Sequence, residues 1–516
     1  MDERLPVYEL ILKNIRSGEL PESFSLPSDP EEEGYIFADG AWDGICMYHM
    51  NRMVMGADEK KLMIKALNFA STADSRNAEI TFTELGKKYR AIMAVDDIQE
   101  YIIKHAKKLP IGNVYRTAME IILHASDKEA VKYALSILEL IPLKDEAPKE
   151  IVRRIGLSDE FTIFAIWNMR KWENGNNEVF RLARKVHGWG RIHCVDKLEP
   201  ATQEIRDWLF KEGIDNRVLS SYSAFPVWEK ADVKNRLNKD MTYEDLKCVG
   251  KILAALTDEG PVVNISRVEN AEQIILEYLT IAEDFRLSNV DYESICTIRD
   301  WAESEDGDDD GATGSRTLIA ERCRDFLSSE ECTEAVEEAV RNGESFSLAR
   351  WLGIDFEEDL FRFMDQDFKN YYYLCSYLTA NDEYFDKVAE LFRDNFPLGS
   401  MRKDPSDNPG VGEEFANYNI LESFLRELRD RPAECEDLII AGLWSPVIRT
   451  RNMSLAVIAE WTKILQQPIS EISGLIYNEL GDMHKKETQD NLKEIEQQLL
   501  DGIIPEESDE EDTGDE

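Results

Sequence analysis

The chain has 516 residues, of which 43% are hydrophobic and 32% are charged, and its formal net charge is −43. This length suits two to four ordinary domains or one elongated repeat array, and no stretch is long and apolar enough to predict a membrane span. The excess of acidic side chains repels phosphate groups, so the composition disfavours nucleic acid and anionic membrane surfaces as direct ligands.

The eight cysteines stand singly along the chain, and none forms a CxxC pair. In a chain of this size the pattern predicts reduced, mostly buried thiols in a reducing compartment. The opening residues MDERLPVYEL lack a basic segment followed by an apolar one, so we expect no signal peptide. Together these features predict a cytoplasmic protein.

Residues 1–44 are predicted to form an irregular leader, because Ser17 to Gly44 is rich in Pro, Gly and acidic side chains. Helical periodicity follows, and residues 45–302 are predicted to be an N-terminal helical repeat region. Within it, Asp127 to Ile141 places apolar side chains at the spacing of one helix face, with Asp127 as the N-cap and Pro142 as the stop.

The same periodicity recurs further along the chain. Glu269 to Phe285 has one apolar stripe with acidic and polar residues between. Asn452 to Leu465 is apolar on two faces, which predicts a helix held between neighbours.

Residues 303–315, with the acidic run ESEDGDDDGATGS, are predicted to form an exposed linker. Whether this linker divides two rigid bodies or is a loop within one superhelix stays open. A C-terminal helical repeat region is predicted over 316–502, and residues 503–516 are predicted to be a disordered acidic tail.

Strand signals are sparse, whereas helices of about 12 to 18 residues alternate with short turns that carry Gly, Asn, Asp or Pro. The predicted fold class is therefore all-α, specifically an α-α superhelix, a HEAT-like solenoid of stacked helix hairpins. One hairpin does not bury its own apolar face, so stacking of neighbouring hairpins makes such a chain fold.

Motifs for nucleotide, flavin, serine-hydrolase and zinc-protease chemistry are absent from the sequence. None of the six histidines has the neighbouring carboxylates of the di-iron or facial-triad iron patterns. We therefore expect no cofactor.

One segment, KVHGWGRIHCVD, places His187, His193, Cys194 and Asp196 near a helix junction. Such side chains bind metals or activate a thiol when they converge. A turn at Gly188 and Gly190, followed by an ordinary core stripe, explains the same residues without any chemistry. These four residues are the first candidates for a catalytic role.

Asp306, Asp308 and Asp310 match the first positions of a calcium-binding loop. The twelfth position, which usually supplies a bidentate glutamate, is Thr317. An acidic, solvated linker explains the run more simply, and the three aspartates are candidate metal ligands.

Aromatic side chains crowd the segment from Phe356 to Tyr377. On a solenoid face they would bind a peptide or helix of a partner, whereas interleaved leucines favour ordinary core packing. Tyr371, Tyr372 and Tyr373 are the candidate partner-binding residues. Three consecutive helical positions face different ways, so at least one of the three is expected to be exposed.

The segments GAWDGICMYHM (from Gly40), GWGRIHCVDKLEP (from Gly188) and RNMSLAVIAEW (from Arg451) resemble a group of uncharacterised bacterial proteins built largely of HEAT-like helices. Some members of that group carry the label "limonene hydroxylase". The resemblance implies an α-solenoid of bacterial cytoplasmic origin, and it supplies no catalytic residues. Hydroxylation of a hydrocarbon requires an iron, haem or flavin cofactor, for which the sequence contains no motif.

Two functional hypotheses remain from the sequence. The first is a non-enzymatic scaffold whose acidic solenoid binds a basic or amphipathic protein partner. The second is an enzyme with a non-local metal or thiol site.

Overall fold

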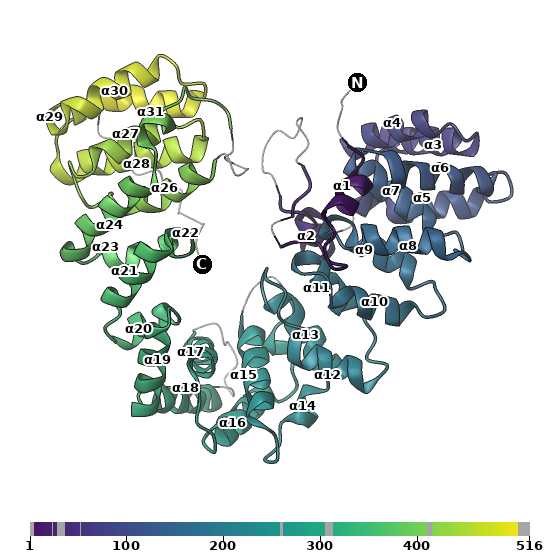
Figure 1. Ribbon diagram of the computed structural model, residues 1–516, viewed down its shortest axis with the longest axis horizontal. Coiled ribbons are helices and arrows are strands. Elements are labelled where there is room, and N and C mark those ends of the chain that lie inside the picture. The colour runs from purple at the N-terminus through teal and green to yellow at the C-terminus, as the bar shows by residue number, and fades with distance from the viewer. Residues whose placement is uncertain are drawn as a thin grey trace. The chain divides into compact units, whose positions relative to one another are not determined.

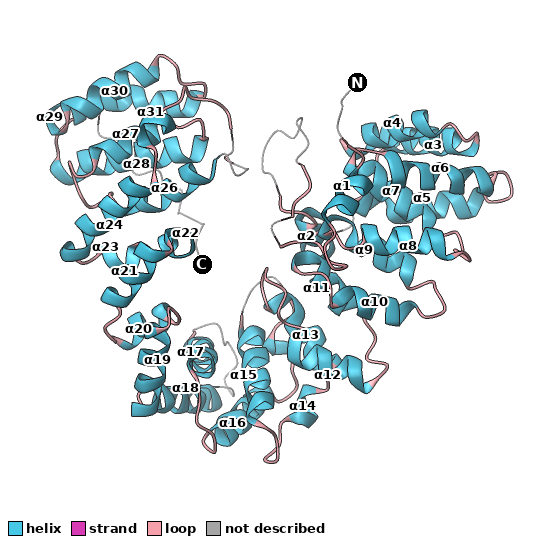
Figure 2. Cartoon of the chain, in the orientation of Figure 1, coloured by secondary structure: helices cyan, strands magenta, loops and turns pink. Residues whose placement is uncertain are grey.

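The computed structural model describes residues 5–22, 24–27, 37–51, 53–258, 262–304, 313–408, 410 and 415–503. Within these ranges the regular elements are 31 α-helices and two short 3₁₀-helices, and Figure 2 shows helices joined by loops without a strand. The all-α prediction is therefore confirmed. In the described part of the chain, no helix has both the length and the apolar character that crossing a membrane requires.

The chain divides into two compact units, and the division falls between Cys332 and Thr333. Unit 1 contains α1 (Val7–Asn14), α2 (Ala41–His49), α3 (Ala57–Ser71), α4 (Ser75–Gly86), α5 (Ala91–His105), α6 (Ile111–His124), α7 (Lys128–Leu138), α8 (Glu146–Ile155), α9 (Asp159–Met169), α10 (Gly175–Ala183), α11 (Gly188–Lys197), α12 (Gln203–Glu212), α13 (Ser221–Lys230), α14 (Val233–Arg236), α15 (Tyr243–Thr257), η1 (Ile265–Arg267), α16 (Ala271–Ala282), α17 (Asn289–Glu303) and α18 (Thr313–Leu327).

The helix α19 (Glu330–Arg341) begins in unit 1 and continues into unit 2. The remaining elements of unit 2 are α20 (Phe346–Leu352), α21 (Glu357–Gln366), α22 (Phe368–Tyr371), η2 (Tyr372–Leu374), α23 (Ser376–Thr379), α24 (Asp382–Asn395), α25 (Leu398–Met401), α26 (Ala416–Glu427), α27 (Glu436–Leu443), α28 (Ile448–Leu465), α29 (Ile469–Ile472), α30 (Gly474–His484) and α31 (Asp490–Leu500).

Helices pack against their near neighbours in the chain. In unit 1, α3 packs on α4, α6 on α7, α9 on α11, α15 on α17 and α17 on α18, and Figure 1 lets the reader follow this succession by colour. In unit 2, α26 and α27 both pack on α28, and α30 packs on α31. Contacts of this kind define stacked helix hairpins, so the predicted superhelical repeat class is confirmed.

Local sequence signals set the ends of several helices. The Asp127 carboxylate accepts a hydrogen bond from the Ala130 backbone N–H at 2.7 Å, so it caps α7 as predicted. The helix predicted over 269–285 is α16, and the helix predicted from Asn452 begins four residues earlier as α28. This earlier start places Arg451 inside α28, where its side chain is fully buried.

The buried Arg451 forms a two-pronged ion pair with the equally buried Glu487, at 2.8 Å from Nε to Oε2 and 2.9 Å from Nη2 to Oε1. Its Nη1 donates to the backbone carbonyls of Ser406 and Ser445, both at 3.0 Å. The guanidinium therefore ties the loop before α26, the start of α28 and the segment before α31 into one core. A charge this deep is tolerated only because its donors are satisfied.

The central helix of the first part of unit 1 is α7, which packs on α4, α5, α6 and α9. Residues 129–138 are all buried, including Lys132. Lys132 is a charged side chain within the mostly apolar run from Ala130 to Leu138, and its ammonium pairs with buried carboxylates.

Two features differ in position from the expected domain boundaries. The helix α1 and the start of α2 fall within residues 1–44, where Val7 and Ile11 are buried because α1 packs on α6 and α8. The division of the chain into two units falls within α19, downstream of the linker predicted over 303–315. Residues 305–312 of that linker, and residues 504–516 of the predicted tail, lie outside the described residues.

Candidate functional site

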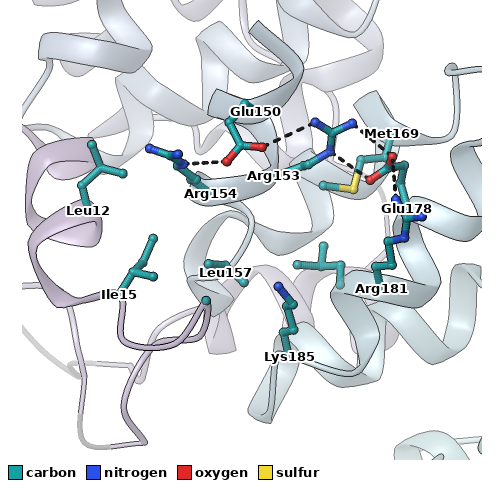
Figure 3. Close-up of a pocket in the computed structure, with 12 residues that line it drawn as sticks. Leu12, Ile15, Glu150, Arg153, Arg154, Leu157, Met169, Glu178, Arg181 and Lys185 are labelled. Atoms are coloured by element: carbon teal, nitrogen blue, oxygen red, sulfur yellow. Dashed lines mark hydrogen bonds and ion pairs between the residues drawn. The ribbon is translucent and has the colours of Figure 1, made fainter. Parts of the chain in front are cut away.

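A cavity of unit 1 lies between α1, α8, α9 and α10 and has a volume of about 710 Å³. Figure 3 shows that its walls come from three directions, with Leu12 and Ile15 on one side, Arg153 and Arg154 above, and Arg181 and Lys185 on the α10 side. This volume falls within the range of about 300–1,000 Å³ that is typical of small-molecule sites.

The floor of the pocket is apolar. Met169 and Leu182 are buried and Leu157 is partly buried beneath it. Met169 ends α9, Leu157 lies between α8 and α9, and Leu182 belongs to α10, while the charged residues of α8 and α10 stand at the rim.

Most charges at the rim are already paired. Arg153 holds the buried Glu178 with two bonds, Nε to Oε2 at 2.9 Å and Nη2 to Oε1 at 3.1 Å. The Arg154 Nε donates to Glu150 at 2.7 Å. Arg181 reaches only the occupied Glu178, at 3.5 Å, and its side chain is 73% exposed. The Lys185 ammonium makes no hydrogen bond or ion pair within the described residues.

The residues predicted for catalysis lie elsewhere in unit 1, on or beside α11. His193 and Cys194 are fully buried. The Nδ1 of His193 lies 3.4 Å from the Tyr48 hydroxyl of α2, and burial lowers the pKa of His193 to about 4. Burial also raises the pKa of the Cys194 thiol far above its usual value.

The structure does not gather these four residues into one reactive centre. His187 precedes α11 at its other end, where burial and the positive charges of Arg217 and Arg191 lower its pKa. Asp196 is paired with Lys197 at 2.7 Å. A reactive thiol needs a lowered pKa, and Cys194 has the reverse. Within the described ranges, no group of three or more His, Cys, Asp or Glu side chains is arranged to hold a metal ion.

A buried charge cluster beside α11 was missed by the sequence reasoning. The Lys132 ammonium of α7 lies 2.8 Å from Asp43 Oδ2, 2.6 Å from Glu160 Oε1 and 3.2 Å from Glu129 Oε1. The second oxygens of the two glutamates accept backbone N–H groups, Ala91 for Glu129 at 2.7 Å and Gly40 for Glu160 at 2.8 Å. The cluster thereby joins α2, α5, α7 and α9.

Electrostatics within the cluster are set by competition between burial and pairing. Burial alone would lower the pKa of Lys132, but its three carboxylates raise it well above the usual value. Burial raises the pKa of Asp43, while Lys132 holds the pKa of Glu160 below its usual range despite burial. The lone lysine in the apolar run of α7 was the signal that could have revealed this cluster. Its geometry is that of a structural ion cluster, since all three carboxylates contact Lys132 and the two glutamates also accept backbone N–H groups.

The predicted aromatic segment lies in unit 2, and its side chains are mostly buried or partly buried. Phe356 and Phe368 are buried, and Tyr371 stacks on Phe363 with 5.4 Å between ring centroids. Tyr372 is partly buried against Phe368. Tyr373 is 61% exposed, which confirms that at least one of the three tyrosines faces outward.

Sequence reasoning overlooked a second exposed aromatic side chain of the same unit, Trp351 at the end of α20, which is 50% exposed. The candidate calcium ligands Asp306, Asp308 and Asp310 lie outside the described residues, so their arrangement stays a prediction.

Comparison of the whole chain with models of known protein families and with curated proteins finds no match in either case. The fold and the geometry above are therefore the basis for any statement about function.

Proposed function

We propose that this protein is a non-enzymatic interaction module that binds a basic or amphipathic protein partner through an acidic face of unit 2. The observation that carries the proposal is the exposed surface of α21 and α24, which pack against each other. Repeat arrays present such faces as extended binding surfaces because each repeat buries only its inner side.

Acidic side chains dominate this face. Both helices turn an apolar stripe inward, with Leu360 and Met364 buried in α21 and Val388 and Phe392 buried in α24. The exposed carboxylates that form no ion pair within the described residues are Glu358, Asp365, Asp386, Glu390 and Asp394.

The basic side chains of these two helices already form ion pairs with carboxylates. Arg362 pairs with Asp359, Lys387 with Glu383 at 3.1 Å, and Arg393 with Asp437 at 2.7 Å. The outward field of α21 and α24 is therefore negative, and a cationic partner gains both affinity and association rate from it.

Exposed aromatic side chains in unit 2 favour an amphipathic partner over a merely cationic one. Trp351 at the end of α20 and Tyr373 in η2 are both exposed, so unit 2 offers apolar surface in addition to the acidic helices α21 and α24. Aromatic residues of this kind supply much of the binding energy at protein interfaces.

The test uses a fluorescent amphipathic helical peptide of Lys and Leu, a scrambled peptide of the same composition, and a Glu/Leu peptide, with binding to the full chain followed by anisotropy. We expect the Lys/Leu helix to bind most tightly. Asp386→Lys combined with Glu390→Lys should weaken it about 10-fold, since two attractive charges become repulsive.

The matched control reverses two exposed glutamates of unit 1, Glu100→Lys with Glu120→Lys, which changes the net charge equally. An equal loss of affinity in both double variants would mean that only overall charge attracts the peptide, and would overturn the proposal. Equal binding of the Glu/Leu peptide would overturn it as well.

A further inference from the structure

The pocket between α1, α8 and α10 has a charge opposite to that of the chain. Its lining includes the cations Arg153, Arg154, Arg181 and Lys185 but only two carboxylates, Glu150 and Glu178. The chain as a whole has a net charge of −43, so its long-range electrostatic field does not attract anions to this pocket. Any anion that binds must be held by contacts inside the pocket.

Pairing among the rim charges leaves Lys185 without a side-chain partner within the described residues, and leaves Arg181 with one long contact to Glu178 at 3.5 Å. Arg153 forms a bidentate ion pair with Glu178, and Arg154 donates a hydrogen bond to Glu150. Arg181 and Lys185 lie four residues apart at the end of α10, and Figure 3 shows the Lys185 amine directed toward the pocket interior near Leu157. Lys185, joined by Arg181 when that side chain leaves its 3.5 Å contact with Glu178, forms a site for an anionic head group.

The apolar half of the pocket sets the rest of the ligand. Leu12 and Ile15 line it on the α1 side, and Leu157, Leu182 and Met169 form its floor. A free inorganic anion would leave this surface uncovered, whereas an alkyl chain would remove it from water, which is favourable.

We propose that this pocket binds a small amphiphilic anion, with a carboxylate or phosphate head held by Lys185 and Arg181 and an alkyl body on Leu157, Leu182 and Met169. The site is in unit 1 and is independent of the acidic face of unit 2. Its chemistry is shared by long-chain carboxylates and alkyl phosphates, and the experiment distinguishes the two.

The turn that closes the α1 side supports a built pocket. Arg16 and Glu19 exchange backbone hydrogen bonds at 2.8 and 3.0 Å, and Ser17 and Gly18 take positive φ angles of 53° and 89° between them. A Cβ at Gly18 would come within 3.3 Å of Lys185 Nζ, so this tight turn brings the backbone beside the ammonium. The cationic end of the pocket is therefore held between a turn and a helix terminus.

The experiment titrates the full chain by calorimetry with decanoate, decyl phosphate, decanol and inorganic phosphate, each below its aggregation concentration. We expect one-to-one binding of decanoate or decyl phosphate, and the tighter of the two identifies the head group. Decanol should bind more weakly because it lacks the anionic head group, and inorganic phosphate should bind more weakly because it lacks the alkyl chain.

Lys185→Gln and Arg181→Gln should each weaken the preferred ligand about 10-fold, the loss expected for one charged hydrogen bond. Lys108→Gln, an exposed lysine of the same unit, is the matched control and should leave the affinity unchanged. Both replaced side chains are exposed, so the variants should keep the wild-type circular dichroism. Absence of binding by both amphiphiles, unchanged affinity in Lys185→Gln, or decanol binding as tightly as decanoate would each overturn the proposal.

Discussion

The ammonium of Lys132 lies 2.8 Å from the Asp43 carboxylate, and both side chains are only 1% exposed. The contact joins α2, near the N-terminus, to the central helix α7 across 89 positions of the chain. Glu129 and Glu160 complete a shell of three carboxylates around this one cation. The first part of unit 1 is therefore held together by a buried charge cluster as well as by apolar packing.

Lys132→Met should strongly destabilise the protein. The substitution takes the cation from the buried Asp43 and Glu160, whereas Glu129 keeps Arg90 at 3.8 Å. Breaking a buried pair in this way costs about 3–5 kcal/mol. Urea unfolding followed by far-ultraviolet circular dichroism measures the change. Lys108→Met at an exposed position should stay within about 0.5 kcal/mol of the wild type. A loss as small as that of the control would show that the cluster contributes little.

Asp159 should make stability fall as pH rises. Burial, together with the negative charge of Asp39, raises the pKa of Asp159 from 3.8 to about 8. Between these values the folded chain keeps a proton that the unfolded chain has released, so the free energy of unfolding decreases with each step in pH. Below this window the carboxyl is protonated in both states, and above it no further loss occurs.

Asp159→Asn removes that titration, and the variant should lose less stability than the wild type between pH 5 and pH 8. Urea unfolding at the two pH values gives the comparison. Glu100→Gln, at an exposed site, should retain the wild-type pH dependence. Parallel pH profiles for Asp159→Asn and wild type would contradict the assignment.

Replacement by alanine should change the free energy of unfolding in opposite directions at two glycines. A Cβ at Gly44 in α2 would lie 2.1 Å from the Trp189 ring, so Gly44→Ala should cost about 1–3 kcal/mol through overpacking. A Cβ at Gly112 in α6 meets nothing within 4 Å, and Gly112→Ala should stabilise by roughly 0.5–1 kcal/mol through helix propensity. Thermal unfolding of both variants measures the two effects, and equal shifts would refute the close approach of α2 to α11.

The Cys194 thiol should resist modification in the native protein. It is fully buried and its pKa is raised by burial, whereas Cys46 is only partly buried. A pulse of N-ethylmaleimide followed by peptide mass spectrometry should label Cys46 before Cys194, and the two should label alike in concentrated urea. Rapid native labelling of Cys194 would instead favour the hypothesis of a thiol enzyme.

The helical class and several helix ends were predictable because they depend on neighbours in the chain. The apolar spacing from Val131 to Leu138 and the Asp127 cap specify α7 through contacts three or four residues apart. The same periodicity located α16. The early start of α28 was not predicted, because the energy that keeps Arg451 buried comes from Glu487, 36 residues away.

The sites depended on the tertiary structure. His193 and Cys194 are sequence neighbours near a turn, which made them candidates, yet folding buries both and shifts the pKa of each away from reactivity. The ion-pair partners of Lys132 could not be identified from the sequence, because Asp43 and Glu160 reach it from α2 and α9 only in the folded structure. The pocket likewise forms only in the folded structure, where side chains of α1, α8, α9 and α10 line it together. Short-range periodicity thus determined the kind of secondary structure, while long-range packing decided which charges are paired, which are buried and which face an open cavity.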